Sequence, residues 1–156
     1  MVMTDETSRI QGGVMSSLGG TSIIGAPPII NHGTEAQKRR WLPGLFSWET
    51  SFCLGITEPS GGSDVGNIRT TATRTADGKH YIVKGHKKWI TGAPWATHMT
   101  TAVRTGGKGM GGISLLVIPL SIPGVSIRKI ESSGQNAGGS SWVTLDDGSS
   151  SLARLY

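Results

Sequence analysis

Residues 55–64 of the chain read GITEPSGGSD, and this stretch decides how the rest of the sequence is interpreted. It follows an apolar run, so it predicts a β-strand that leads into a loop. The glycines of the loop allow backbone amides to come close to a ligand. Thr57 and Ser63 offer hydroxyl groups, and Glu58 and Asp64 can tie the loop to its own backbone. The stretch therefore predicts a ligand-binding loop, with an elaborate turn as the alternative.

The sequence after Ser51 is rich in Thr, Val, Ile and Gly, and runs with strand character recur about every 8–14 residues. Asp77-Gly78 separates two of these runs and is a strong signal for a β-hairpin. The predicted strands are 52–56, 69–74, 81–84, 87–91, 100–104, 113–118, 125–130 and 141–145. Many short strands separated by turn residues predict an antiparallel β-barrel or an orthogonal β-sandwich.

The first third of the chain predicts helices. Residues 5–18 can form one helix, and residues 21–33 read as an irregular connector because they contain a Pro pair. A second helix is predicted after Thr34, which forms a capping-box pattern with Gln37. Pro43 is expected to end or kink that helix. The fold class predicted is therefore α+β, with a short helical N-terminal segment before the β-rich part.

Composition divides the chain of 156 residues into three segments. Residues 1–50 form the helical segment, residues 51–147 the β-domain, and residues 148–156 a divergent tail. The tail is Ser-rich at first and lacks strand periodicity, so we expect a frayed end.

Composition also excludes several classes of protein. Hydrophobic residues make up 36% and charged residues 16%, which is typical of neither a disordered chain nor a membrane protein. The apolar runs are too short to span a bilayer, and no signal peptide is visible, so we expect an intracellular protein. The single cysteine, Cys53, can form neither an internal disulfide nor a metal cluster, and no metal site is predicted.

The net charge of +5 is spread along the chain. Two short basic clusters, Lys38-Arg39-Arg40 and Lys84 with Lys87 and Lys88, are predicted to be solvated faces. A protein that binds nucleic acid usually concentrates such charge on one element with aromatic residues between. No nucleic-acid partner is therefore expected, although a mild positive field also suits a phosphorylated ligand.

One segment has the pattern of a dinucleotide-binding motif but not its structural context. Residues 107–112 fit the pattern G-x-G-x-x-G. That pattern binds a pyrophosphate when a helix follows it, because the helix N-terminus supplies the amides and the dipole. Here a predicted strand follows, so we expect a flexible hairpin loop.

A second motif, GHKKWIT at residues 85–91, lies downstream of the first. Thr-Glu-Pro and Gly-Ser-Asp in the first motif, together with the second, resemble the signature of acyl-CoA dehydrogenases. Residues 27–43, PPIINHGTEAQKRRWLP, are similar to the last helices of that family's N-terminal domain. The resemblance covers nearly the whole chain up to Asp147. It implies that residues 51–147 are the middle β-domain of such an enzyme, which binds FAD and acyl-CoA.

The resemblance also implies roles for individual residues. Thr57 would hydrogen-bond the isoalloxazine ring, Trp89 would pack beside it, and Thr91 would reach its N5 edge. Ser63 would also contact the acyl thioester. Without the resemblance, Trp89 would be read as a core tryptophan on a strand. The residues implied in cofactor binding are Leu54, Gly55, Ile56, Thr57, Glu58, Gly62, Ser63, Trp89, Ile90 and Thr91.

Members of the family continue into a C-terminal helical bundle, which supplies the catalytic Glu. We therefore assign no catalytic residue to this chain and expect a truncated dehydrogenase with little or no activity alone. We also expect self-association or a helical partner chain, because apolar surface that the bundle covers would be exposed. The alternative is a stand-alone β-domain that serves as a non-redox ligand-binding or biosynthetic module.

Overall fold

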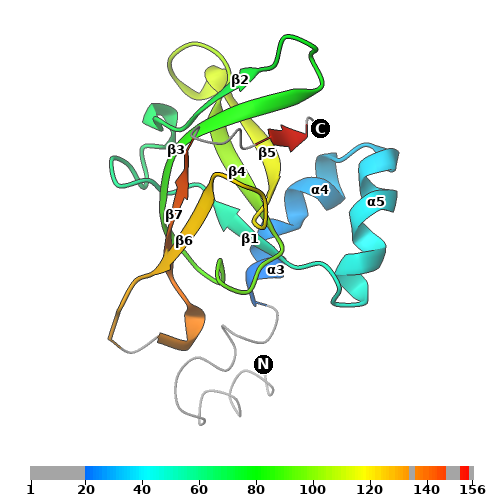
Figure 1. Ribbon diagram of the computed structural model, residues 1–156, viewed down its shortest axis with the longest axis vertical. Coiled ribbons are helices and arrows are strands. Elements are labelled where there is room, and N and C mark those ends of the chain that lie inside the picture. Colours follow the sequence, from blue (N-terminus) through cyan, green and yellow to red (C-terminus); the bar gives the residue numbers. More distant parts are fainter. Residues whose placement is uncertain (1–19, 134–135, 147–151, 155–156) are drawn as a thin grey trace.

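The computed structural model describes residues 20–133, 136–146 and 152–154, and it shows a curled β-sheet with helices on one side (Figure 1). The helix predicted over residues 5–18 lies outside the described residues. The predicted α+β fold, in which a short helical segment precedes a curled sheet, is confirmed.

Three helices cover one side of the sheet: α3 (Gly20–Gly25), α4 (Pro27–His32) and α5 (Glu35–Phe46). The predicted capping box is present, because the Thr34 hydroxyl accepts from the Gln37 amide and the Gln37 side chain accepts from the Thr34 amide. The prediction of an irregular connector over 21–33 was wrong. A proline at the start of a helix lacks only an amide that would have no partner there, so the Pro pair begins α4. Pro43 does not end α5, which continues to Phe46.

Eight strands form the sheet, and their order is β1-β4-β5-β8-β3-β7-β6, with β2 paired to both β3 and β4. Three short 3₁₀ turns lie between strands: η1 (Val65–Asn67), η2 (Met110–Gly112) and η3 (Asn136–Gly138). The strands are β1 (Phe52–Gly55), β2 (Thr71–Arg74), β3 (His80–Ile90), β4 (His98–Arg104), β5 (Ile113–Pro119), β6 (Val125–Lys129), β7 (Ser141–Leu145) and β8 (Leu152–Arg154).

Most pairings in the sheet are antiparallel, as predicted, but two are parallel. β1 runs parallel to β4, and β2 meets β4 in a single parallel pair. The predicted hairpin joins β2 and β3, and Gly78 adopts the positive φ of 69° that its turn requires. The two strands predicted over 81–84 and 87–91 are one long strand, β3. Its first half pairs with β2 and its second half with β7.

Residues 152–154 form a strand, although a frayed tail was predicted there. Leu152–Arg154 forms β8, which pairs with His80–Ile82 of β3 and with Val117 of β5. The expectation of a frayed tail was therefore wrong for these residues. Backbone amides and carbonyls at a free sheet edge can pair with a segment of almost any sequence, so side-chain periodicity gives no warning of such a strand.

Two apolar clusters fix the frame on which the site is built. The larger lies inside the curled sheet and includes Cys53, Met99, Ile118 and Val143. The smaller joins the helices to β1 and β5 through Trp41, Phe52 and Val117, among others. The rings of Trp41 and Phe52 meet edge to face, with centroids 6.3 Å apart. Strand β1 is therefore anchored on both faces before the loop that follows it.

The glycine-rich segment at residues 107–112 lies in the hairpin between β4 and β5, as predicted, and contains only η2. The Arg104 side chain holds this loop by donating to the carbonyl of Gly109 at 3.2 Å. It also donates to the carbonyls of Gly66 at 2.6 Å and Ile68 at 3.2 Å. Arg104 thus joins the β4–β5 loop to the segment that precedes β2.

Candidate functional site

The first motif continues from the anchored end of β1 and makes a tight turn. The Glu58 amide donates to the carbonyl of Gly61 at 2.9 Å, and the Gly61 amide donates back to Glu58 at 3.2 Å. These two bonds close the turn around Pro59-Ser60. Gly62 and Ser63 follow the turn and are exposed. A β-carbon built on Gly62 would meet no described atom within 4 Å, so this part of the loop faces open space.

The second motif lies at the end of β3, where the strand is irregular. Its pairing with β7 shifts register between Lys87 and Ile90, which marks a β-bulge. Trp89, inside this bulge, has a φ of 64° and is 51% exposed. A left-handed backbone at a non-glycine residue costs about 1–3 kcal/mol and is common at functional sites. The reading of Trp89 as a core tryptophan is wrong, because its indole faces outward beneath the Lys88 ammonium, 4.6 Å from the ring centroid.

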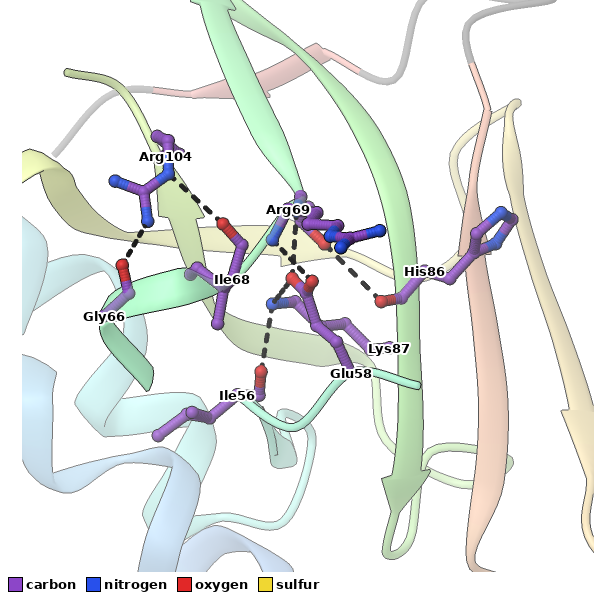
Figure 2. A network of polar contacts seen from close by, with 9 residues as sticks. Ile56, Glu58, Gly66, Ile68, Arg69, His86, Lys87 and Arg104 are labelled. Atoms are coloured by element: carbon purple, nitrogen blue, oxygen red, sulfur yellow. Dashed lines mark hydrogen bonds and ion pairs between the residues drawn. The ribbon is translucent and has the colours of Figure 1, made fainter. Parts of the chain in front are cut away.

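The two motifs are in direct contact, and Figure 2 shows how their side chains meet. The Lys87 ammonium donates to the Ile56 carbonyl at 3.1 Å and to a Glu58 carboxylate oxygen at 2.8 Å. The next residue along β3, Lys88, donates its amide to the Thr57 carbonyl at 2.9 Å. Three consecutive residues of the first motif are therefore bound by two consecutive residues of the second.

The Glu58 carboxylate also organises the segment that leads into β2. It accepts from the Arg69 amide at 2.6 Å and from the Thr70 amide at 3.0 Å. Gly85 of β3 makes this approach possible, because a β-carbon there would lie 2.7 Å from the Thr70 α-carbon. Glu58 was predicted to tie the loop to its own backbone, but its carboxylate binds the backbone of residues 69–70, outside the loop. Asp64, the other candidate, accepts from the Asn67 side chain at 2.6 Å.

Burial and hydrogen bonding act in opposite directions on the ionisation of Glu58. Burial raises its pKa, but the bonds from Lys87, Thr70 and Arg69 together outweigh burial and hold the pKa below its ordinary value. Burial lowers the pKa of Lys87, and the bond and charge of Glu58 oppose that shift. The carboxylate with its three donors is the ionised form of Glu58 that this site favours.

Lys87 is a buried residue between the two motifs that sequence reasoning missed. It was predicted to lie on a solvated face with Lys84 and Lys88, yet it is fully buried. The signal that could have found it is the two-residue period of a strand, because Val83 and Lys87 point to the same, inner side of β3. Lys84 is exposed and Lys88 is half-buried, so only one lysine of the cluster enters the interior.

The structure brings together only part of the predicted cofactor-binding set. Residues 56–58 lie against β3 directly before Trp89, and Thr91 follows β3 and is half-buried. Leu54 is half-buried on β1. Gly55 and Ile90 are buried, with Gly55 against Met99. Gly62 and Ser63 lie beyond the turn, and no hydrogen bond between described residues links them to β3.

Several polar groups of the motifs are free to meet a ligand. Within the part of the chain that the structure describes, no hydrogen bond engages the hydroxyls of Thr57, Ser63 or Thr91. A planar, polar-edged ring system needs a flat apolar wall and hydrogen-bond donors, which the exposed indole of Trp89 and these hydroxyls can supply. The residues present therefore fit a flavin ring.

Neither a metal centre nor a membrane-spanning helix is found among the described residues. No group of three or more His, Cys, Asp and Glu there is placed to hold a metal ion. In the same residues, no helix has the length and apolar character needed to cross a bilayer.

The sequence profile described as "Acyl-CoA dehydrogenase, middle domain" matches residues 53–148, and the one described as "Acyl-CoA dehydrogenase, N-terminal domain" matches residues 1–49. The chain belongs to the acyl-CoA dehydrogenase family. An acyl-CoA dehydrogenase of Emericella nidulans, apdG, is 47% identical over 148 residues, which are 94% of this chain and 34% of the relative. This chain thus spans about a third of the length of the curated relatives that it matches.

Solved acyl-CoA dehydrogenases share the fold. The enzyme of Geobacillus kaustophilus superposes with a TM-score of 0.79 at 34% identity, over 89% of this chain and 37% of that one. An acyl-CoA dehydrogenase of Bacillus anthracis was solved in complex with FAD. It superposes with a TM-score of 0.77 at 29% identity, over 86% of this chain and 22% of that one. The family is therefore shown by sequence and by fold.

Proposed function

We propose that this chain forms the flavin-facing part of an FAD-dependent acyl-CoA dehydrogenase, which removes two hydrogens from the α and β carbons of an acyl thioester. One observation carries this proposal: the loop at residues 56–58 is bound to β3 immediately before an exposed, left-handed Trp89. Family membership and the FAD complex of the Bacillus anthracis relative support the choice of cofactor.

The residues of this chain would bind and orient the ring. The Trp89 indole offers a flat wall for one face of the isoalloxazine, and the free hydroxyls of Thr57 and Thr91 can donate to its polar edge. Donors that are fixed in place stabilise the negative charge that builds up on a reduced flavin. These residues would hold FAD, which would supply the acceptor for the β-hydride of the substrate.

The acyl thioester would meet the exposed part of the first motif. Ser63 is exposed after the turn and can donate its hydroxyl to the thioester arm. No residue of this chain is assigned the role of the base that removes the α-proton. We predict that the isolated chain has little or no dehydrogenase activity. Turnover of an acyl-CoA with an artificial electron acceptor measures this activity.

We also propose that the helical side of the molecule associates with a second copy or with a helical partner. Ile23 is 73% exposed and Phe46 is 75% exposed, and Ile24 and Ile30 are exposed as well. All three helices contribute such side chains, and a large exposed apolar patch is typical of a surface that another protein covers. Light scattering of the purified chain tests for a second copy, and a monomer at high concentration excludes it; copurification tests for the helical partner.

The test of the cofactor is a titration of FAD into the whole chain, followed by flavin absorbance and fluorescence. We expect saturable binding that Trp89→Ala weakens. Trp48→Ala is the matched control, because Trp48 is also exposed and left-handed, with a φ of 65°, but lies outside both motifs. Equal weakening by both substitutions contradicts the proposal. Absence of FAD binding by the wild-type chain also contradicts it, and favours a β-domain that binds a different ligand.

A further inference from the structure

The contact between the two motifs depends on one buried ion pair. The Glu58 and Lys87 side chains are 3% and 0% exposed, and their oxygen and nitrogen atoms are 2.8 Å apart. They connect three segments that are distant in sequence: the first motif, the end of β3, and the backbone of residues 69–70. Figure 2 shows the carboxylate and the ammonium at the centre of this network, with Arg104 holding the far side of the segment before β2.

Stability of the fold gives little reason to bury such a pair. Removing two charges from water is unfavourable, and a buried ion pair is often no more stabilising than two apolar side chains of the same size. Strand β3 is already held along its length by β2, β8 and β7. A buried ion pair does differ from apolar packing in one respect, because its hydrogen bonds are directional and allow only one arrangement of the groups they join.

The Glu58–Lys87 pair fixes the position of two residues that are proposed to meet the cofactor, Thr57 and Trp89. The Lys87 ammonium binds the carbonyl directly before Thr57, and its carboxylate partner belongs to the residue directly after Thr57. Along β3, Lys87 is the last residue before the bulge that turns Trp89 outward. The same pair thus sets the place of the Thr57 hydroxyl and the start of the bulge that presents the indole.

We propose that Glu58 and Lys87 are positioning residues that hold the Thr57 loop in register with Trp89, so that the two can meet one flavin ring. The positioning of the loop follows from the contacts of this chain alone, whereas its purpose rests on the function proposed above. Neither residue touches the cofactor in this scheme, although the family resemblance implies Glu58 in cofactor binding. The pair acts through the backbone of its neighbours.

The test uses the double variant Glu58→Gln/Lys87→Met in the full chain. The two substitutions keep the approximate size of the side chains and leave neither charge unpaired, so the variant is expected to fold. The matched control is Glu35→Gln/Lys38→Met, which removes an exposed ion pair of 3.3 Å on α5. Thermal unfolding checks that both variants are folded. Lys87→Met alone is avoided here, since it would leave a buried carboxylate without its partner.

The first readout is amide hydrogen exchange without FAD. The Lys88 amide, which is bonded to Thr57, reports on the loop, and the amides between β4 and β5 report on opening of the whole sheet. We expect exchange at Lys88 to accelerate by about tenfold or more in the double variant, with the β4–β5 amides unchanged. A purely structural role would accelerate both sets together. Unchanged exchange at Lys88, or equal acceleration of both sets, overturns the proposal.

The second readout is the dissociation constant of FAD. We expect it to rise about tenfold in the double variant and to stay at the wild-type value in the control. Loosened exchange at Lys88 with an unchanged FAD affinity overturns the proposed purpose of the pair. If the wild-type chain itself binds no FAD, the cofactor proposal fails, and the exchange measurement still decides whether the pair positions the loop.

Discussion

Two parts of the interior are equally buried but are held together in different ways. Inside the sheet, Val83 and Val143 are fully buried among other apolar side chains. A short distance along β3, Lys87 is just as buried but meets a carboxylate and a carbonyl. Apolar packing is not directional, so it tolerates small rearrangements. The hydrogen bonds of the polar network allow only one geometry, and a substitution of any member leaves another without its partner. The site therefore lies in the part of the interior that tolerates substitution least.

The largest expected effect comes from breaking the polar network on one side only. Lys87→Met leaves the Glu58 carboxylate buried without its cation, and we expect it to lower the free energy of unfolding by about 3–5 kcal/mol. Chemical denaturation measures the change. The double variant Glu58→Gln/Lys87→Met is expected to recover most of the loss. A single variant as stable as the wild type would show that solvent reaches the carboxylate.

A cavity in the apolar part should lower the free energy of unfolding by a similar amount, but it should leave the affinity for FAD unchanged. Leu116, on β5, is 2% exposed. Leu116→Ala is expected to lower the free energy of unfolding by about 2–5 kcal/mol through lost burial and the space left behind. Because the Leu116 side chain is apolar and takes no part in the hydrogen bonds that join the two motifs, the folded fraction should bind FAD with wild-type affinity. A weakened affinity in fully folded protein would contradict the separation of the two regions.

The difference between the two parts also explains what the sequence could predict. Strands and the hairpin at Gly78 follow from local patterns, such as the two-residue period and the Asp-Gly turn, and the capping box at Thr34 is local as well. The strand period places Lys87 on the inner side of β3, but the pairing that keeps it there is not local, because its partner Glu58 lies 29 residues away. The parallel pairing of β1 with β4 and the addition of β8 likewise depend on distant segments. The roles of the motif residues toward a flavin stay predictions.

Acid should destabilise the polar network but not the apolar part, and the effect on stability should be smaller than that of the substitutions above. The folded-state pKa of Glu58 lies below its ordinary value of 4.5, because the bonds from Lys87, Thr70 and Arg69 outweigh burial. The stability from this carboxylate is therefore present above pH 4.5 and is lost as the pH falls through its lowered pKa. We expect the unfolding temperature of the wild type to fall more steeply below pH 4.5 than that of the double variant. Asp77, whose pKa is also lowered, is common to both proteins. Parallel curves would contradict the prediction.

Cys53 is the titratable group of the apolar part of the interior. Burial raises the pKa of its thiol to about 12, so the thiol stays neutral where the carboxylate of the polar network stays charged. Only the thiolate reacts with disulfide reagents. We therefore expect no appreciable reaction of the native chain at pH 8 and full reaction in denaturant. Because the reaction requires opening of the sheet, Lys87→Met should accelerate it by about a hundredfold or more, since each 1.4 kcal/mol of stability corresponds to a factor of ten. An unchanged rate in that variant would mean that Cys53 is reached by local opening, and that the polar network and the apolar core do not unfold together.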